Sequence, residues 1–148
     1  MKLILCLSDE NGMMFNHRRE SRDRVLIGRL LEVTGDGAIC MKAYSVPLFP
    51  EGSSRVRKIE DISQVGEEEY FFDEDTDPAA FSSEVNEILL YRWNRSYPAD
   101  VKCTMEFDAF SKTAAYDFAG SSHDCITEER YTRRGTANKT EEKDSECS

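Results

Sequence analysis

Residues 3–41 decide the fold of this chain, because they contain LILCL at 3–7, RVLIGRLLEV at 24–33 and AICM at 38–41. The first and last of these are continuous apolar runs, which are typical of strands buried on both faces of a sheet. The middle segment repeats apolar residues at the spacing of one helix face. A strand, a helix and a second strand in this order predict a crossover connection and therefore a parallel sheet.

The ends of the predicted helix carry suitable capping residues. Ser21 or Asp23 could cap its first turn with a side-chain oxygen, and Gly35 follows its last turn. Between the first strand and this helix, residues 13–23 are dominated by charge and are predicted to form a loop.

The remaining segments extend the sheet. They predict strands at 56–59, 70–72, 88–93 and 101–107, short helices at 43–49 and 78–83, and a closing hairpin of 114–118 with 126–132. The expected fold class is α/β, with a single mixed, mainly parallel sheet, flanking helices and a C-terminal antiparallel hairpin. Residues 1–133 are expected to form this one domain. Residues 134–148 contain no aromatic residue and no Val, Leu or Ile, so they are predicted to be a disordered tail.

The overall charge limits the partners. The chain has a formal net charge of −10 at pH 7, so bulk nucleic acid and anionic membranes should repel it. No apolar run reaches the roughly 18 residues of a membrane span. The 5 cysteines form no C-x-x-C pair, which is typical of a reduced compartment and offers no zinc site. We therefore expect a cytoplasmic protein without a membrane or metal partner.

Four segments carry a resemblance to the dihydrofolate reductases. They are LILCLSDENG at 3–12, CMKAYS at 40–45, NEILLYRW and SYPAD within 86–100, and AGSSHDCITEERYTR at 119–133. Their order and spacing are similar to the landmark strands and loops of that family. The resemblance implies a dihydrofolate reductase-like fold. The family's activity is the NADPH-dependent reduction of a pterin.

The cofactor position departs from the family's pattern. The family has glycines that let backbone amides approach the pyrophosphate of NADPH, whereas here EYFF at 69–72 is followed by DEDTD at 73–77. The acidic side chains would repel a phosphate, so the sequence argues against NADPH as a cofactor. Asp23 resembles the family's proton-relay carboxylate, and a helix N-cap is its alternative role. A residual pterin or flavin reductase acting through Asp23 is one hypothesis.

A second resemblance is to short proteins of Gram-positive bacteria that carry the label ribonuclease Z. The two-zinc enzymes of that name use a His-x-His-x-Asp-His motif, which this chain lacks, so their mechanism is excluded. The 2 histidines of the chain are His17 and His123. A metal-free phosphodiesterase could use them as general base and acid. The alternative is that His17 is an exposed loop residue and His123 a hairpin-turn residue, with no catalytic role.

Residues 17–24, the arginine loop, gather positive charge in this acidic protein. Beside His17 they contain four arginines: Arg18, Arg19, Arg22 and Arg24. These either bind an external anion, nucleotide or RNA, or pair internally with Glu20, Asp23 and the acidic residues 73–77. The leading hypothesis is a reductase-like domain that has lost its cofactor site and binds a small anionic ligand or nucleotide at the arginine loop.

Overall fold

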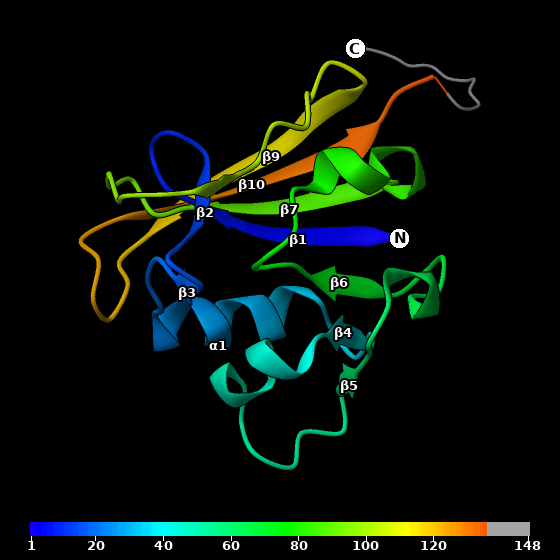
Figure 1. Ribbon diagram of the computed structural model, residues 1–148, viewed down its shortest axis with the longest axis horizontal. Coiled ribbons are helices and arrows are strands. Elements are labelled where there is room, and N and C mark those ends of the chain that lie inside the picture. Colours follow the sequence, from blue (N-terminus) through cyan, green and yellow to red (C-terminus); the bar gives the residue numbers. More distant parts are fainter. Residues whose placement is uncertain (136–148) are drawn as a thin grey trace.

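The computed structural model describes residues 1–135 of the chain. Its main sheet has seven strands in the order β5-β4-β6-β1-β7-β10-β9 (Figure 1). They are β1 (Lys2–Leu7), β4 (Ile39–Met41), β5 (Val56–Lys58), β6 (Tyr70–Phe72), β7 (Glu87–Arg92), β9 (Phe110–Phe118) and β10 (Ile126–Arg133). Pairing is parallel from β5 to β7, and β10 pairs antiparallel with both β7 and β9. The predicted α/β class, with a mixed, mainly parallel sheet and a C-terminal hairpin, is confirmed.

Both faces of the central strands are buried. On one face, Leu30 of α1 (Arg24–Val33) and Ile4 of β1 belong to one apolar cluster. On the other face, Leu3 of β1 and Phe81 belong to a second cluster. Alternate side chains of a strand point to opposite faces, so a strand covered on both sides needs the continuous apolar run that β1 has.

The helix begins and ends at the residues that the sequence indicates. The Asp23 side chain accepts hydrogen bonds from the backbone N–H groups of Val25 and Leu26, so Asp23 is the N-cap of α1. Gly35 has a φ of 65°, the left-handed conformation with which glycine ends many helices. The connections of the sheet contain short 3₁₀ helices, which are η1 (Ala43–Leu48), η2 (Ile62–Gln64) and η3 (Pro78–Glu84). The short helices predicted at 43–49 and 78–83 are thus confirmed.

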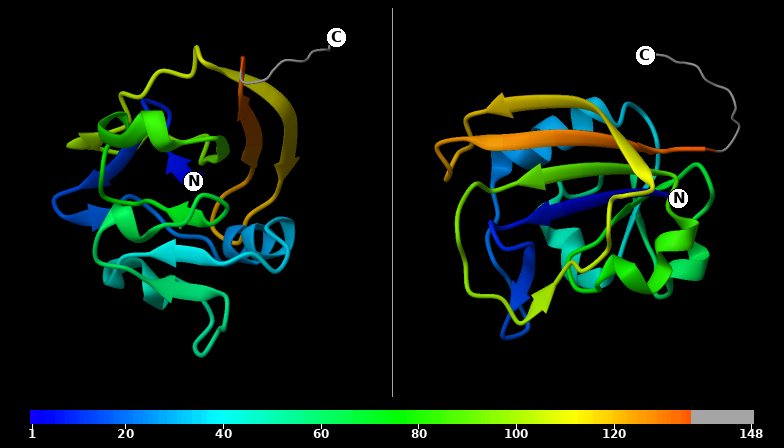
Figure 2. Two further views of the ribbon diagram at one scale, coloured as in Figure 1. Left: turned by 90° about the vertical axis from the view of Figure 1, so that its right-hand side faces the viewer. Right: turned by 90° about the horizontal axis from the view of Figure 1, so that it is seen from above.

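The prediction of a loop over residues 13–23 is wrong for its first half. A second, antiparallel sheet consists of β2 (Gly12–Phe15), β3 (Arg18–Arg19) and β8 (Val101–Lys102). Figure 2 shows it near the arrowhead ends of β1 and β7. The hairpin of β2 and β3 turns at Asn16 and His17, both with positive φ, as the favoured two-residue turns require. Asn-Gly would have marked this turn in the sequence, whereas Asn-His is a weaker signal.

The strand predicted at 101–107 is also mostly absent, because only Val101–Lys102 pairs with a neighbouring strand. The alternating pattern nevertheless predicted burial correctly, since Cys103 and Met105 are buried. The backbone N–H of Thr104 donates to the Asp77 side chain rather than to another strand. A period of two therefore indicated which side chains face the core, but not how the backbone is paired.

Two further predictions concern the chain end and the membrane. The disordered tail predicted at 134–148 lies, apart from Arg134 and Gly135, outside the described residues. Within residues 1–135, α1 is the longest α-helix at 10 residues, and no helix has the length and apolar character needed to cross a membrane.

Candidate functional site

A narrow cavity lies at the carboxyl ends of the parallel strands β1, β6 and β7. Cys6, Phe72 and Trp93 line it from these strand ends. Residues 19–23, from the end of β3 to the N-cap of α1, also line it. The cavity has a volume of about 20 Å³, which is room for about one water molecule. Ligands of open α/β sheets bind at this edge, so the cavity is the first candidate site.

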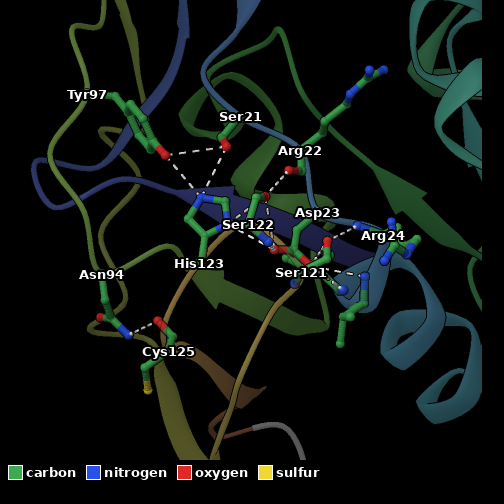
Figure 3. A network of polar contacts seen from close by, with 12 residues as sticks. Ser21, Arg22, Asp23, Arg24, Asn94, Tyr97, Ser121, Ser122, His123 and Cys125 are labelled. Carbon is green, nitrogen blue, oxygen red and sulfur yellow. Dashed lines mark hydrogen bonds and ion pairs between the residues drawn. The ribbon is translucent and has the colours of Figure 1, made fainter.

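His123 contacts the wall of this cavity through a network of polar groups (Figure 3). Its Nδ1 atom lies 3.0 Å from Oδ2 of Asp23. Its Nε2 atom lies 3.1 Å from Oγ of Ser21 and 3.0 Å from the hydroxyl oxygen of Tyr97. The Trp93 ring stacks on the imidazole with ring centroids 4.4 Å apart. Because the His123 side chain is only 2% exposed, its ring is held by protein groups rather than by water.

Asp23 joins the start of α1 to the turn before β10. Besides capping the helix, its carboxylate accepts hydrogen bonds of 2.8 Å from the backbone N–H groups of Ser121 and Ser122. Burial alone would raise the pKa of Asp23, but the hydrogen bonds from His123 and from backbone N–H groups together hold it well below its ordinary value. The carboxylate is therefore ionised, and its oxygens are engaged within the protein.

The ionised Asp23 also decides which nitrogen of His123 carries a proton. A carboxylate only accepts hydrogen bonds, so we assign the proton to Nδ1, which donates it to Asp23. When the ring carries no second proton, Nε2 has a lone pair that accepts a hydrogen bond from Ser21 or Tyr97. In this tautomer, His123 is placed to take a proton from either hydroxyl group.

Two carboxylates of the cavity wall have oxygen atoms without a partner. Oδ2 of Asp73, a residue 2% exposed, and Oε1 of Glu20 make no hydrogen bond within residues 1–135. Burial raises the pKa of Asp73 to about 7, and burial also raises the pKa of Glu20. No group of three or more His, Cys, Asp or Glu side chains in the described part of the chain is placed to hold a metal ion. Because buried polar atoms are almost always paired, the two oxygens mark a place where a ligand or a water molecule would donate.

Arg19 of the arginine loop is paired inside the protein. Its guanidinium donates two hydrogen bonds to the Glu74 carboxylate, at 2.9 and 3.1 Å, and stacks over the Tyr44 ring at 4.3 Å. Glu74 also accepts a hydrogen bond of 2.7 Å from Ser45. These contacts link β3 to the acidic loop that follows β6. For Arg19, the structure therefore favours pairing within the protein over binding of an external anion.

Arg22 and Arg24 lie on either side of Asp23 and are exposed. Both border an open groove of about 370 Å³ that also contains Ser121 and Ser122. Among residues 1–135, neither arginine side chain forms an ion pair. The positive charge of these two residues is therefore available to an external anion.

The structure brings together Asp23 and His123 but leaves His17 out of their network. His17 and Arg18 are exposed at the turn between β2 and β3. Within residues 1–135 no side-chain hydrogen bond or ion pair involves His17, so no polar contact links it to His123.

The sequence gives little signal for two other members of the site, Ser21 and Tyr97. Ser21 is interpretable only as a possible helix cap, and Tyr97 belongs to a stretch that alternates aromatic residues with arginines. They lie 102 and 26 residues from His123 along the chain, and no motif links them. For Asp73 a signal did exist, because it directly follows a buried strand, and the carboxyl ends of parallel strands meet at the binding edge.

We expect Arg19→Gln to lower the free energy of unfolding by about 1 kcal/mol, since it removes a two-pronged and partly buried ion pair. Arg18→Gln is the matched control, and it should change stability by less than about 0.5 kcal/mol. Urea denaturation at low and high salt measures both. Equal effects of the two substitutions would contradict the pairing of Arg19 with Glu74.

One comparison with known proteins identifies the fold. A dihydrofolate reductase from Enterococcus faecalis, solved in complex with NADP(H) and RAB-propyl, is similar to this chain with a TM-score of 0.67. The match covers 90% of this chain and 96% of that chain, at 7% sequence identity. No protein-family model and no curated protein matches the sequence. At this identity the similarity shows the fold alone, and it confirms the predicted dihydrofolate reductase-like fold.

Proposed function

We propose that this chain binds a small planar heterocycle with amino groups and an anionic tail, as in a guanine nucleotide or a folate, and that it is not an NADPH-dependent reductase. The observation that carries the proposal is the buried, unpaired Oδ2 atom of Asp73 in the cavity wall. The cavity is also at the edge of the sheet where α/β proteins bind their ligands.

The unpaired carboxylate oxygens favour a ligand that donates hydrogen bonds. Exocyclic amino groups and ring N–H groups suit Oδ2 of Asp73 and Oε1 of Glu20, because a carboxylate is a strong acceptor. A donor or positive charge would also stabilise the ionised form of Asp73, which burial disfavours. Leu26, Phe72 and Trp93 provide the apolar surfaces against which a planar ring would pack.

The unpaired arginines favour an anionic tail. The open groove shares Arg22, Ile27 and Leu48 with the narrow cavity and adds Arg24. A phosphate or carboxylate in this groove would gain charge-assisted hydrogen bonds from both arginines. The proposal keeps the anionic ligand expected from the sequence, but its contacts are Arg22 and Arg24 rather than Arg19.

Binding requires the cavity to open, because about 20 Å³ admits a water molecule but not a ring. The pair of Arg19 with Glu74 holds part of the cavity wall in place. A ligand must therefore overcome the stability of this closed arrangement, which lowers its apparent affinity.

NADPH is an unsuitable ligand for the same edge of the sheet. The loop after β6 has no glycine between Asp73 and Asp77. Glu74 in this loop is bound to Arg19 and Ser45, so acidic side chains stand where the family's backbone amides would approach a pyrophosphate. The negative charges of these side chains would repel those of a pyrophosphate. We therefore propose that NADPH-dependent reduction is lost.

The enzyme alternatives have less support. Proton transfer to a pterin through Asp23 needs an oxygen that is free to contact the ligand, but both carboxylate oxygens of Asp23 already accept hydrogen bonds within the protein. A phosphodiesterase, or any RNA-cleaving site, using His17 and His123 as general base and acid needs both at one phosphate. His17 is exposed in a hairpin turn, while His123 is bound to Asp23.

The fluorescence of Trp93 tests the proposal, because Trp93 is the single tryptophan of the chain and lines the cavity. We expect GMP and folate to quench it with micromolar dissociation constants. AMP lacks the 2-amino group of GMP, so it would lose one charge-assisted hydrogen bond. It should therefore bind at least about tenfold more weakly than GMP. NADPH should give no saturation.

Two substitutions provide the controls for this titration. The double change Arg22→Gln and Arg24→Gln should weaken GMP binding by about tenfold or more, whereas Arg18→Gln should leave it unchanged. Equal affinity for AMP and GMP, or saturation by micromolar NADPH, would contradict the proposal.

A further inference from the structure

We propose that Ser21, His123 and Asp23 form a nucleophile–base–carboxylate triad that hydrolyses esters of short acyl chains. The activity goes beyond ligand binding and does not depend on which heterocycle the cavity accepts. It rests on one juxtaposition: the two nitrogens of a single buried imidazole face a serine hydroxyl on one side and an ionised carboxylate on the other.

The distances meet the requirements of such a triad. Oγ of Ser21 lies 3.1 Å from Nε2 of His123, and Oδ2 of Asp23 lies 3.0 Å from Nδ1. Both values fall within the range of about 2.6 to 3.2 Å expected between a nucleophile, its base and the group that orients the base. Triads of this kind occur on unrelated folds and in different chain orders, so their geometry defines them.

The base is fixed in the tautomer that the chemistry needs. Asp23 keeps its charge because backbone N–H groups of α1 and of the Ser121–Ser122 turn donate to it. It therefore holds the proton of His123 on Nδ1 and leaves Nε2 free to accept the serine proton. Stacking on Trp93 keeps the imidazole plane pointed at Ser21. An oriented base of this kind activates a hydroxyl group that is otherwise a weak nucleophile.

The surroundings of Ser21 select a small acyl group. Ser21 is half-buried and lines the narrow cavity, together with Leu26, Phe72 and Trp93. These walls are apolar, and the free volume of about 20 Å³ holds only about one water molecule. The cavity must therefore open for an acyl group too, and a short acyl chain requires less opening than a long one.

Tyr97 is the donor placed to stabilise the developing negative charge. Its hydroxyl oxygen lies 3.0 Å from Nε2 of His123 and 3.4 Å from Oγ of Ser21. Nε2 has one lone pair, so when Ser21 donates to it the Tyr97 hydroxyl is released. A carbonyl oxygen next to the carbon attacked by Ser21 then comes within hydrogen-bond distance of Tyr97, as an oxyanion donor requires.

The reaction needs only the ester and water. Oγ of Ser21 forms a bond to the carbonyl carbon and gives its proton to Nε2 of His123. The ester C–O bond breaks, the leaving alcohol takes that proton, and the acyl group stays on Ser21. Water, deprotonated by the same nitrogen, then attacks the acyl carbon, which releases the carboxylic acid and restores the serine hydroxyl.

The test combines covalent labelling with turnover. A fluorophosphonate probe should label the wild-type protein once, and peptide mapping should locate the added mass on Ser21. The protein should hydrolyse p-nitrophenyl acetate with a higher kcat/KM than p-nitrophenyl octanoate. Ser21→Ala should abolish labelling and lower kcat/KM for the acetate by at least about 100-fold. Ser83→Ala, an exposed serine in η3, is the matched control and should behave as wild type.

The readouts separate this inference from the proposed ligand and from misfolding. Ser21→Ala should keep the wild-type circular dichroism spectrum and urea midpoint, because within residues 1–135 the Ser21 side chain makes two hydrogen bonds, to His123 and Tyr97. Folded wild-type protein that takes no label, or Ser21→Ala turnover within twofold of wild type, would overturn the triad even if GMP binds.

Discussion

Replacing Asp23 with alanine should lower the free energy of unfolding by about 3 to 5 kcal/mol, because several buried donors lose their acceptor and each costs about 1 to 3 kcal/mol. The substitution leaves the backbone N–H groups of Ser121 and Ser122 and Nδ1 of His123 without an acceptor. A buried donor without a partner is destabilising, because it has lost its hydrogen bonds to water and forms none within the protein. The helix cap of α1 is lost in the same change.

Asp61 provides the matched control for Asp23. It is also the N-cap of a helix, η2, but it is exposed and its side chain accepts a hydrogen bond only from a neighbouring N–H group. Asp61→Ala should therefore cost about 1 kcal/mol or less. Urea denaturation at pH 7 compares the two. Equal losses would mean that Asp23 acts as a helix cap alone and does not hold the turn at His123.

Replacing Asp73 with asparagine should stabilise the protein by about 2 to 4 kcal/mol at pH 8, since each pKa unit between the folded and unfolded states is worth about 1.4 kcal/mol. Burial raises the pKa of Asp73 from 3.8 to about 7. Between these two values the folded chain keeps a proton that the unfolded chain loses, so the stability contributed by this residue falls as the pH rises through that range. Asparagine removes the ionisation and can still accept the hydrogen bond from the Thr76 N–H.

The pH dependence gives this prediction its control. The stability difference between Asp73→Asn and the wild type should be small near pH 4 and should grow until about pH 7. Asp75→Asn, an exposed residue of the same loop, should show no such growth. A loss of stability in Asp73→Asn at pH 8 would contradict the prediction, because it would show that the folded protein stabilises the ionised Asp73 carboxylate. The same substitution should weaken GMP binding, so its gain in stability would accompany a loss of function.

The sequence predicted the scaffold well because local patterns determine it. The apolar runs of β1 and β7, the helical spacing of α1 and the cap at Asp23 all report local geometry that the structure contains. The hairpin of β2 and β3 was missed because Asn16 and His17 adopt positive φ without a glycine to signal it.

The candidate site was predicted less well because long-range contacts create it. His123 was a candidate, but its partners Ser21 and Tyr97 come from distant segments, and only the fold brings them to Nε2. Asp73 was predicted only as part of an acidic loop, and its position at the end of a buried strand makes it a buried carboxylate. The sequence predicted one common role for the four arginines of the arginine loop. In the structure Arg19 is paired with Glu74, whereas Arg22 and Arg24 form no ion pair within residues 1–135.

The central claim is that the unpaired oxygen of Asp73 receives a donor from a bound heterocycle. A crystal structure of the protein grown with GMP tests this claim most directly. We predict that the guanine ring lies between Trp93 and the residues that line the cavity from α1, with an amino or ring nitrogen within about 3.2 Å of Oδ2 of Asp73 and the phosphate between Arg22 and Arg24. A nucleotide bound elsewhere on the protein, with the cavity still closed by Arg19 and Glu74, would contradict it.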